Sequence, residues 1–183
     1  MNQDMTKIYY GLSLQLPIYL RALTSDGTRE PAGMFYLRLS PPMTKVDKED
    51  ALDRVEAAVK EHFRLNGMVL RDLEVIEAMD RGYASGSTLE AVSTQKDGSI
   101  KASEKLQDTD FFQKLMEHSL HKAKEFSELI LRGEIPASPV KEGGPSSRAW
   151  TPCTYCGYRA LCGHYGDEDG YRIITKKGAE DIR

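Results

Sequence analysis

The residues best suited to metal chemistry gather in one stretch near the C-terminus. Cys153, Cys156 and Cys162 are the only cysteines in 183 residues, and all three lie within ten positions. A C-x2-C pair lets one turn present two thiolates to a single metal ion or cluster. The stretch therefore predicts a metal centre, but its spacing leaves open which metal binds and which group supplies the fourth ligand.

Zinc is one candidate for this centre. His164 lies two residues after Cys162, so three thiolates and one imidazole could complete a tetrahedral set within the chain. The single residue between these last two ligands is shorter than the usual spacing. Three reduced cysteines without a metal are the remaining alternative.

Composition limits the kinds of partner. The chain is 40% hydrophobic and 29% charged, with a formal net charge of -3, so any contact with DNA has to be a local basic path. Its length suits one domain of ordinary size. The start is polar and no apolar run is long enough to cross a membrane, so we expect a cytoplasmic protein without a membrane segment.

Hydrophobic periodicity predicts an α/β fold in which helices alternate with short strands. Pro17 should either lie near the first turn of its helix or kink it. Asp72 should be an N-cap, and the buried side of the second helix should carry Leu52, Val55, Val59 and Phe63. The expected helices span residues 9–23, 47–63, 72–80 and 108–132, the last closed by Gly133, and the expected extended segments span residues 31–39 and 67–70.

The remaining segments have loop and linker composition. Residues 81–88 indicate a loop, and Lys96-Asp-Gly-Ser predicts a hairpin with a two-residue turn. Residues 136–149 are rich in proline, glycine and serine and are expected to lack regular structure. The chain is thus divided into an α/β domain at 1–135, a linker at 136–149 and a cysteine segment with a tail at 150–183.

Two motifs at opposite ends of the chain carry a family resemblance. The segment that begins Tyr9-Tyr-Gly-Leu-Ser-Leu-Gln-Leu-Pro-Ile-Tyr, combined with C-x2-C-x5-C, resembles the C-terminal nuclease region of the B subunit of bacterial ATP-dependent helicase/deoxyribonucleases. That group belongs to the PD-(D/E)xK nuclease superfamily, in a branch marked by a Gln-x-x-x-Tyr helix and an iron–sulfur staple. The likeness covers nearly the whole chain and implies a partial nuclease-like domain, with a mixed sheet flanked by helices.

Gln15 and Tyr19 match the Gln-x-x-x-Tyr motif. Residues four apart share one helix face, so the amide and the phenol can reach into one site. Neither group can carry hydrolysis, because an amide does not titrate and a phenol is a poor base at neutral pH. The resemblance implies an accessory role, in which the pair positions DNA or supports metal-bound groups. The alternative is a surface glutamine beside a half-buried core tyrosine.

The sequence lacks one motif that nucleases of this class need. They hold divalent cations, here Mg²⁺, with acidic residues, and a lysine follows the second carboxylate by two positions. No lysine in this sequence has an acidic residue two positions earlier. In the family, Asp-x-Lys lies just before the Gln-x-x-x-Tyr helix, a position that falls upstream of Met1. We therefore expect a fragment that begins after the catalytic motif and does not cut DNA by itself.

The resemblance also implies a [4Fe–4S] cluster. Cys153, Cys156 and Cys162 would supply three of its thiolates, and a fourth cysteine would lie outside this chain. The implied function is the processing of DNA ends in double-strand break repair by recombination. The implied partners are the A subunit of the helicase–nuclease, the upstream part of the parent chain and a single-stranded DNA tail. The alternative is a small metal-stapled module that binds nucleic acid or protein without catalysis.

Other polar and aromatic residues admit two interpretations. Those around the cysteines could form a basic and aromatic path for single-stranded DNA, or the aromatic rings could pack around the metal. We expect His62, His118 and His121 to be solvated or to lie on helix surfaces, and the acidic runs at 47–50 and 167–169 to be solvated. The path would comprise Arg148, Trp150, Tyr155, Tyr158, Arg159 and Arg172.

Overall fold

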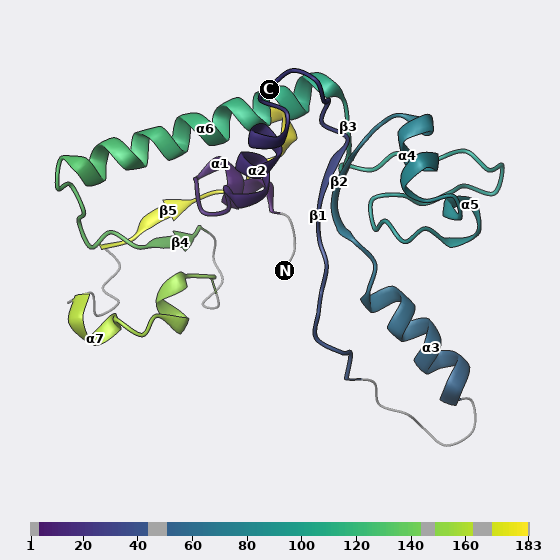
Figure 1. The fold of residues 1–183 in the computed structure, drawn as a ribbon. Helices are drawn as coiled ribbons and strands as arrows, with labels where there is room; N and C mark the ends of the chain where they lie inside the picture. The colour runs from purple at the N-terminus through teal and green to yellow at the C-terminus, as the bar shows by residue number, and fades with distance from the viewer. Residues whose placement is uncertain (1–3, 44–50, 144–148, 163–169, 183) are drawn as a thin grey trace. The chain divides into compact units, whose positions relative to one another are not determined.

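The computed structural model describes residues 4–43, 51–143, 149–162 and 170–182. The chain divides into two compact units, which we treat one at a time. The first unit is Gln15–Met116, and the second unit is Asp4–Leu14 together with Glu117–Arg183. Figure 1 shows the elements of both units.

A three-stranded mixed sheet forms the first unit's framework. Its strands β1 (Gly33–Tyr36), β2 (Asn66–Leu70) and β3 (Leu106–Gln107) lie in the order β1-β2-β3. β1 pairs with β2 in antiparallel register, and β2 pairs with β3 in parallel register. The two extended segments expected from sequence are confirmed, as is the α/β class with a mixed sheet flanked by helices.

One helix of the first unit begins at the capping residue that the sequence predicts. In α4 (Leu73–Met79), the Asp72 carboxylate accepts hydrogen bonds from the backbone amides of Glu74 at 2.9 Å and Val75 at 3.3 Å, which confirms it as N-cap. Helix α2 (Gln15–Leu23) holds Pro17 in its first turn, as expected. The expected helix at 9–23 was too long, because the chain turns at Tyr10–Leu14 before α2 begins.

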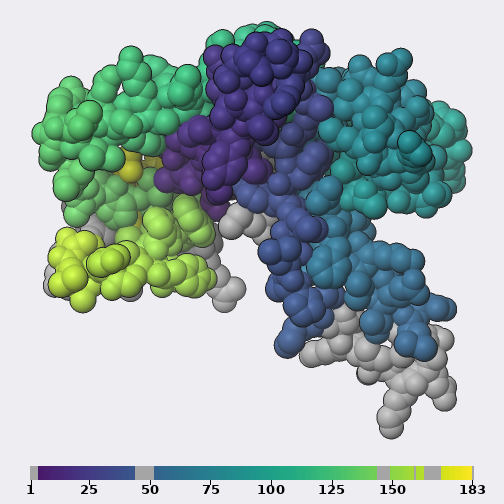
Figure 2. Space-filling view, in the orientation of Figure 1, coloured from purple at the N-terminus to yellow at the C-terminus, as the bar shows by residue number. Residues whose placement is uncertain are grey.

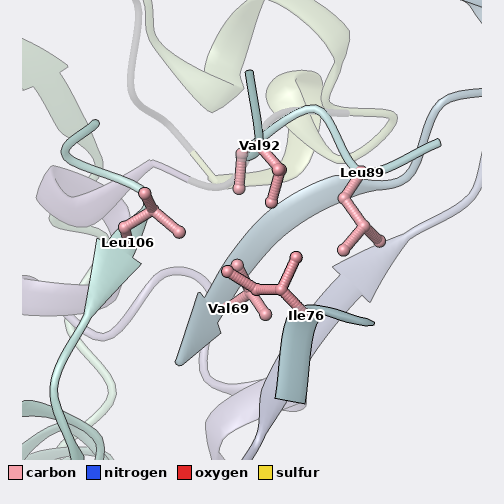
Figure 3. Packing of buried hydrophobic residues seen from close by; sticks show 6 residues of the cluster. Val69, Ile76, Leu89, Val92 and Leu106 are labelled. Carbon is pink, nitrogen blue, oxygen red and sulfur yellow. The ribbon is translucent and has the colours of Figure 1, made fainter. Parts of the chain in front are cut away.

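The first unit's core lies between β2, α4 and the loop that follows. Figure 3 shows the side chains of Val69, Ile76, Leu89, Val92 and Leu106 pointing toward one another. Residues 81–88, expected as a loop, contain the single helical turn α5 (Tyr83–Gly86).

The predicted hairpin after this core is present with a different turn. Thr94 bridges Ile100 in antiparallel fashion, and the Gln95 amide donates to the Ser99 carbonyl at 2.8 Å. The loop therefore has three residues, and Gly98, with φ of +85°, supplies the left-handed position that such a loop requires. The expectation of a two-residue turn was wrong because the Asp-Gly pair marks a turn but does not determine which residues pair across the two arms of the hairpin.

Helix α3 (Ala51–His62) confirms the predicted helix but not its burial. Leu52 is 84% exposed and Phe63, just beyond the helix, is 39% exposed, whereas Val55 and Val59 are half-buried. Figure 2 shows much of α3, in blue, at the surface. Periodicity identifies the apolar face of a helix, but only tertiary structure decides whether another element covers that face.

The long helix α6 (Thr109–Leu131) confirms the prediction for residues 108–132, and Gly133, with φ of +74°, closes it. On its apolar side, Phe112, Leu115 and Met116 are buried together with Ser119, whereas Leu120 and Ile130 are exposed. In the described part of the chain, no helix combines the length and apolar character needed to cross a membrane.

A two-stranded parallel sheet and short helices form the rest of the second unit. β4 (Val140–Glu142) pairs with β5 (Arg172–Ile174), and the Glu142 amide donates to the Trp150 carbonyl at 2.9 Å. The expectation that residues 136–149 lack regular structure was therefore wrong, although the domain boundaries themselves stay a prediction. The short elements are α1 (Met5–Tyr9), α7 (Arg159–Cys162) and two 3-10 turns, η1 (Pro152–Tyr155) and η3 (Ala179–Asp181).

Hydrogen bonds join the two ends of the second unit's sequence. The Thr6 hydroxyl accepts from the Lys177 amide at 3.0 Å and lies 3.4 Å from the Lys177 carbonyl, to which it donates. Lys177 Nζ lies 2.9 Å from an Asp181 carboxylate oxygen and 4.9 Å from the centroid of the Tyr9 ring. The C-terminal residues therefore secure α1, which precedes the turn into α2.

Candidate functional site

Gln15 and Tyr19 form a hydrogen-bonded pair on α2. Gln15 Nε2 donates to Tyr19 Oη at 3.2 Å, one helical turn away. Both residues are exposed, and Tyr19 is 56% exposed. Tyr19 is therefore not a core residue, and the pair faces solvent, where a ligand can reach it.

The pair offers hydrogen bonds and no acid or base. Its internal bond uses an amide N–H and the phenol oxygen, so the phenol O–H and the Gln15 carbonyl oxygen stay available to a ligand. One donor beside one acceptor suits contacts to phosphate oxygens, sugars or base edges. This arrangement can form hydrogen bonds to a polar ligand, but hydrolysis needs other groups.

The cysteines lie on two short turns. The Thr151 hydroxyl accepts from the Cys153 amide at 3.3 Å, and the Cys156 amide donates to the Cys153 carbonyl at 3.4 Å, which closes the C-x2-C turn. Cys162 ends α7, where its amide donates to the Tyr158 carbonyl at 3.0 Å. Cys153 is half-buried, Cys156 and Cys162 are exposed, and none forms a disulfide.

The cysteines suit a metal by their chemistry but are not grouped around a common metal position. Cysteine thiolates are donors that iron–sulfur clusters and zinc prefer. Among the described residues, however, no three Cys, His, Asp or Glu side chains are grouped to hold a metal ion. His164, the fourth ligand of the zinc alternative, lies outside the described residues. The three cysteines thus fit a thiophilic metal by type, and their convergence on one stays a prediction.

The cysteine segment is anchored by a contact that sequence reasoning missed. Lys7 Nζ on α1 lies 4.3 Å from the centroid of the Trp150 ring, three residues before Cys153. This cation–π contact holds the entrance of the cysteine segment against α1. Nothing local in the sequence marks it, because the two residues lie near opposite ends of the chain.

The aromatic residues of the predicted DNA path divide between two environments. Tyr155 is 87% exposed and Tyr158 is 73% exposed, whereas Trp150 is half-buried beneath Lys7. The Arg172 Nε donates to the Ser138 carbonyl at 3.0 Å. Arg148 and both acidic runs lie outside the described residues.

Two of the histidines make specific contacts. His62 Nε2 lies 2.7 Å from the Ser40 carbonyl. His118 Nε2 lies 3.0 Å from the Tyr9 carbonyl, and its ring stacks on the Tyr9 ring at 5.5 Å. Both lie on helices and are partly exposed, as expected, and each also donates to a backbone carbonyl.

Comparison with known proteins gives one consistent result. A family model described as the PD-(D/E)XK nuclease superfamily matches residues 1–163. The B subunit of an ATP-dependent helicase/deoxyribonuclease from Alkaliphilus metalliredigens is 32% identical to this chain over 87% of the chain's length. The protein of the same name from a Thermoanaerobacter species is 32% identical over 96% of the chain. The Bacillus cereus protein of that name is 29% identical over 97% of the chain.

These relatives are much longer than the chain. The chain spans only 14% of the Alkaliphilus protein, 15% of the Thermoanaerobacter protein and 16% of the Bacillus cereus protein. The family model matches most of the chain, including the Gln15–Tyr19 pair and the three cysteines. The chain belongs to the PD-(D/E)XK nuclease superfamily.

Proposed function

We propose that the chain works as part of the nuclease domain in the B subunit of a helicase–deoxyribonuclease and helps to degrade DNA ends. The observation that carries this proposal is the solvent-exposed, hydrogen-bonded Gln15–Tyr19 pair in a chain of the nuclease superfamily. The names of its relatives support DNA as the substrate.

In this proposal, Gln15 and Tyr19 hold the DNA strand at the nuclease site. The phenol O–H would donate to a phosphate oxygen, and the amide carbonyl would accept from an amino group at a base edge, so that the pair fixes the strand beside the scissile phosphate. Hydrolysis would use Mg²⁺ bound by carboxylates and a lysine two positions after an acidic residue. Because no lysine of this sequence has that neighbour, these groups would come from polypeptide outside it.

Cys153, Cys156 and Cys162 would hold a [4Fe–4S] cluster together with a fourth cysteine from outside the sequence. A cluster stabilises a domain because it binds several thiolates and closes a long loop. The zinc alternative uses the same three cysteines with His164. Metal analysis after anaerobic purification separates these two, since iron with sulfide supports the cluster and stoichiometric zinc without iron contradicts it.

The wider assignment follows from the relatives' name. Their designation as the B subunit implies a partner A subunit, and a helicase joined to a deoxyribonuclease suits the processing of double-strand breaks for recombination in the cytoplasm. The competing function is a metal-stapled module that binds nucleic acid or protein without catalysis. The missing acidic-x-Lys motif favours that alternative for the chain acting alone.

A chimera tests the proposal. This chain would replace the matching segment of the Thermoanaerobacter relative, with which it aligns over 96% of its length. The chimera, together with its partner, would be assayed for Mg²⁺-dependent degradation of linear duplex DNA. We expect cleavage that EDTA abolishes. A chimera that unwinds DNA but does not cut it contradicts the proposal.

A further inference from the structure

A cavity of about 940 Å³ opens beside α3 in the first unit. Its walls come from the second half of α3, from residues 83–88 and from residues 92–94. In the described part of the chain, its lining includes neither the Gln15–Tyr19 pair nor any cysteine. The cavity is therefore separate from the proposed nuclease site.

Hydroxyl groups at this cavity already donate to protein acceptors. The Ser87 and Thr88 hydroxyls donate to the Asp80 carboxylate at 2.9 and 3.0 Å. The Ser85 hydroxyl donates to the Gly82 carbonyl at 3.0 Å. These protons are therefore not available to a polar ligand.

The charged groups at the cavity are also paired. Among the described residues, the cations in its lining are Lys60 and Arg64. Lys60 Nζ lies 2.9 Å from a Glu56 carboxylate oxygen, and an Arg64 terminal nitrogen lies 3.1 Å from a Glu61 carboxylate oxygen. Each cation is balanced by a neighbouring carboxylate, so the rim does not favour an anion such as a nucleic acid phosphate.

The surface that lacks a partner is apolar. Ala57, Val59, Phe63 and Val92 line the cavity, and Leu52 continues the stripe of Val59 and Phe63 along α3. Leu52 is 84% exposed and Phe63 is 39% exposed. An exposed apolar surface with a polar rim is typical of a site for another protein segment.

A second exposed apolar segment lies beside the end of α3. His62 Nε2 lies 2.7 Å from the Ser40 carbonyl, which places the residues that follow β1 against the helix. On this segment, Leu39 is 85% exposed and Met43 is fully exposed. Both α3 and the segment beside it therefore present uncovered apolar side chains.

The exposed apolar surface of α3 is small for a partner that binds as a separate molecule. Each partner in a standard complex of two proteins buries about 800 Å², and Leu52 and Phe63 supply only part of such an area. A segment of the same polypeptide needs less contact area, because a tether raises its effective concentration to about the millimolar range. The relatives have such polypeptide, since the chain spans only 14% and 15% of two of them.

We propose that the cavity and the exposed side of α3 dock an apolar helix from the B subunit's own polypeptide outside this sequence. Apolar side chains of that helix, one or two turns apart, would enter the cavity beside Phe63 and cover Leu52. None of the described strands β1, β2 and β3 lines the cavity, so the occupant binds through side chains, as a helix does, and not as an added strand. This inference rests on the proposed function in one respect, that the chain is part of a longer B subunit.

The test is photo-crosslinking of the chimera in complex with its A subunit. The chimera would carry p-benzoylphenylalanine in place of Leu52, and crosslinked peptides would be identified by mass spectrometry. We expect crosslinks to B-subunit residues outside the sequence of this chain. Mixing isotopically labelled and unlabelled chimera shows whether a crosslink joins one polypeptide or two copies. Arg54, which is exposed and lies about 200° around the helix from Leu52, is the control position and should not reach the same peptide.

Amide hydrogen exchange provides a second measurement. Leu52→Glu in the chimera should quicken exchange in α3 about 10-fold or more, the shift expected when one leucine is lost from a docked interface. Arg54→Glu should leave the exchange unchanged. In the isolated chain Leu52 is already 84% exposed, so Leu52→Glu should have no effect there. An equal effect in the isolated chain and in the chimera would contradict docking.

Four crosslinking results overturn the proposal: crosslinks to the A subunit, to a second copy, to DNA, or only to residues within this sequence. The first three would each identify a different occupant. Leu52 is exposed in the isolated chain, so its replacement does not disturb the core. Failure of the proposed nuclease function would appear as a chimera that unwinds DNA without cutting it, and would leave the crosslinks from position 52 unchanged.

Discussion

Gln15 Nε2 and Tyr19 Oη share a hydrogen bond of 3.2 Å on the exposed side of α2. The bond holds two polar groups together where solvent reaches them. We propose that these two groups hold the DNA strand.

The pair should matter for function and not for folding. Gln15→Ala and Tyr19→Phe each remove a polar group from the surface, where substitutions usually change the free energy of unfolding by less than about 0.5 kcal/mol. Urea unfolding of the isolated chain, followed by circular dichroism, measures this. A loss of more than about 2 kcal/mol would give the pair a structural role instead.

Gly67 should not tolerate a side chain. A Cβ at this position would collide with the Met34 carbonyl on the neighbouring strand β1. We expect Gly67→Ala to lower the free energy of unfolding by about 1–3 kcal/mol, because the strands must separate. Gly157→Ala is the matched control, since its Cβ would meet no atom within 4 Å. Equal stability of the two variants would contradict the β1–β2 pairing.

Asp80 should make stability depend on pH in the acid range. Burial alone would raise the pKa of its carboxyl, but hydrogen bonds from Thr88, Ser87 and Gly82 outweigh burial and lower the pKa below the usual 3.8. A lowered pKa in the folded state stabilises the protein above about pH 3.8, and this stabilisation is lost as pH falls through the folded pKa.

The Asp80→Asn variant isolates this contribution from those of the other acids. Its free energy of unfolding should fall below that of the parent chain by about 1–2 kcal/mol at pH 7, because charge-assisted hydrogen bonds are lost. The gap should shrink below pH 3.8, where the parent carboxyl protonates. Denaturant titrations above and below that pH measure the difference in free energy of unfolding between the two proteins. A difference that keeps its full size in acid would show that it does not come from the ionised Asp80 carboxylate.

Thr6 should be needed to hold the C-terminal segment. Its hydroxyl is buried and accepts from the Lys177 amide at 3.0 Å. Thr6→Val keeps the shape but leaves that amide without its acceptor, at a cost of about 1–3 kcal/mol. Hydrogen exchange at Lys177 should quicken, whereas Thr154→Val, at an exposed threonine, should have no effect there. Unchanged exchange would mean that other contacts secure the segment.

The sequence correctly predicted the elements whose formation depends on residues close together in the chain. Asp72 caps α4 as expected, and α6 follows its apolar period to Gly133, because a side-chain cap and a long amphipathic helix are encoded in neighbouring residues. The exposed face at Leu52 was not predicted, since covering a helix depends on distant elements.

Long-range pairings could not be found in the same way. The strand β4 has three residues and lies in a segment of linker composition, so only its partner β5 makes it a strand. For the candidate site, the four-residue spacing of Gln15 and Tyr19 correctly predicted a shared helix face. The contact of Lys7 with Trp150, and the cavity around Phe63, depend on tertiary structure and left no pattern in the sequence.

The most direct test is the ratio of DNA cleavage to DNA unwinding by the chimera carrying Tyr19→Phe or Gln15→Ala. If the pair positions the scissile strand, each substitution should lower cleavage about 10-fold or more, the range seen when a positioning contact is lost, and leave unwinding unchanged. Cleavage and unwinding that both remain at the level of the unsubstituted chimera would contradict the central claim.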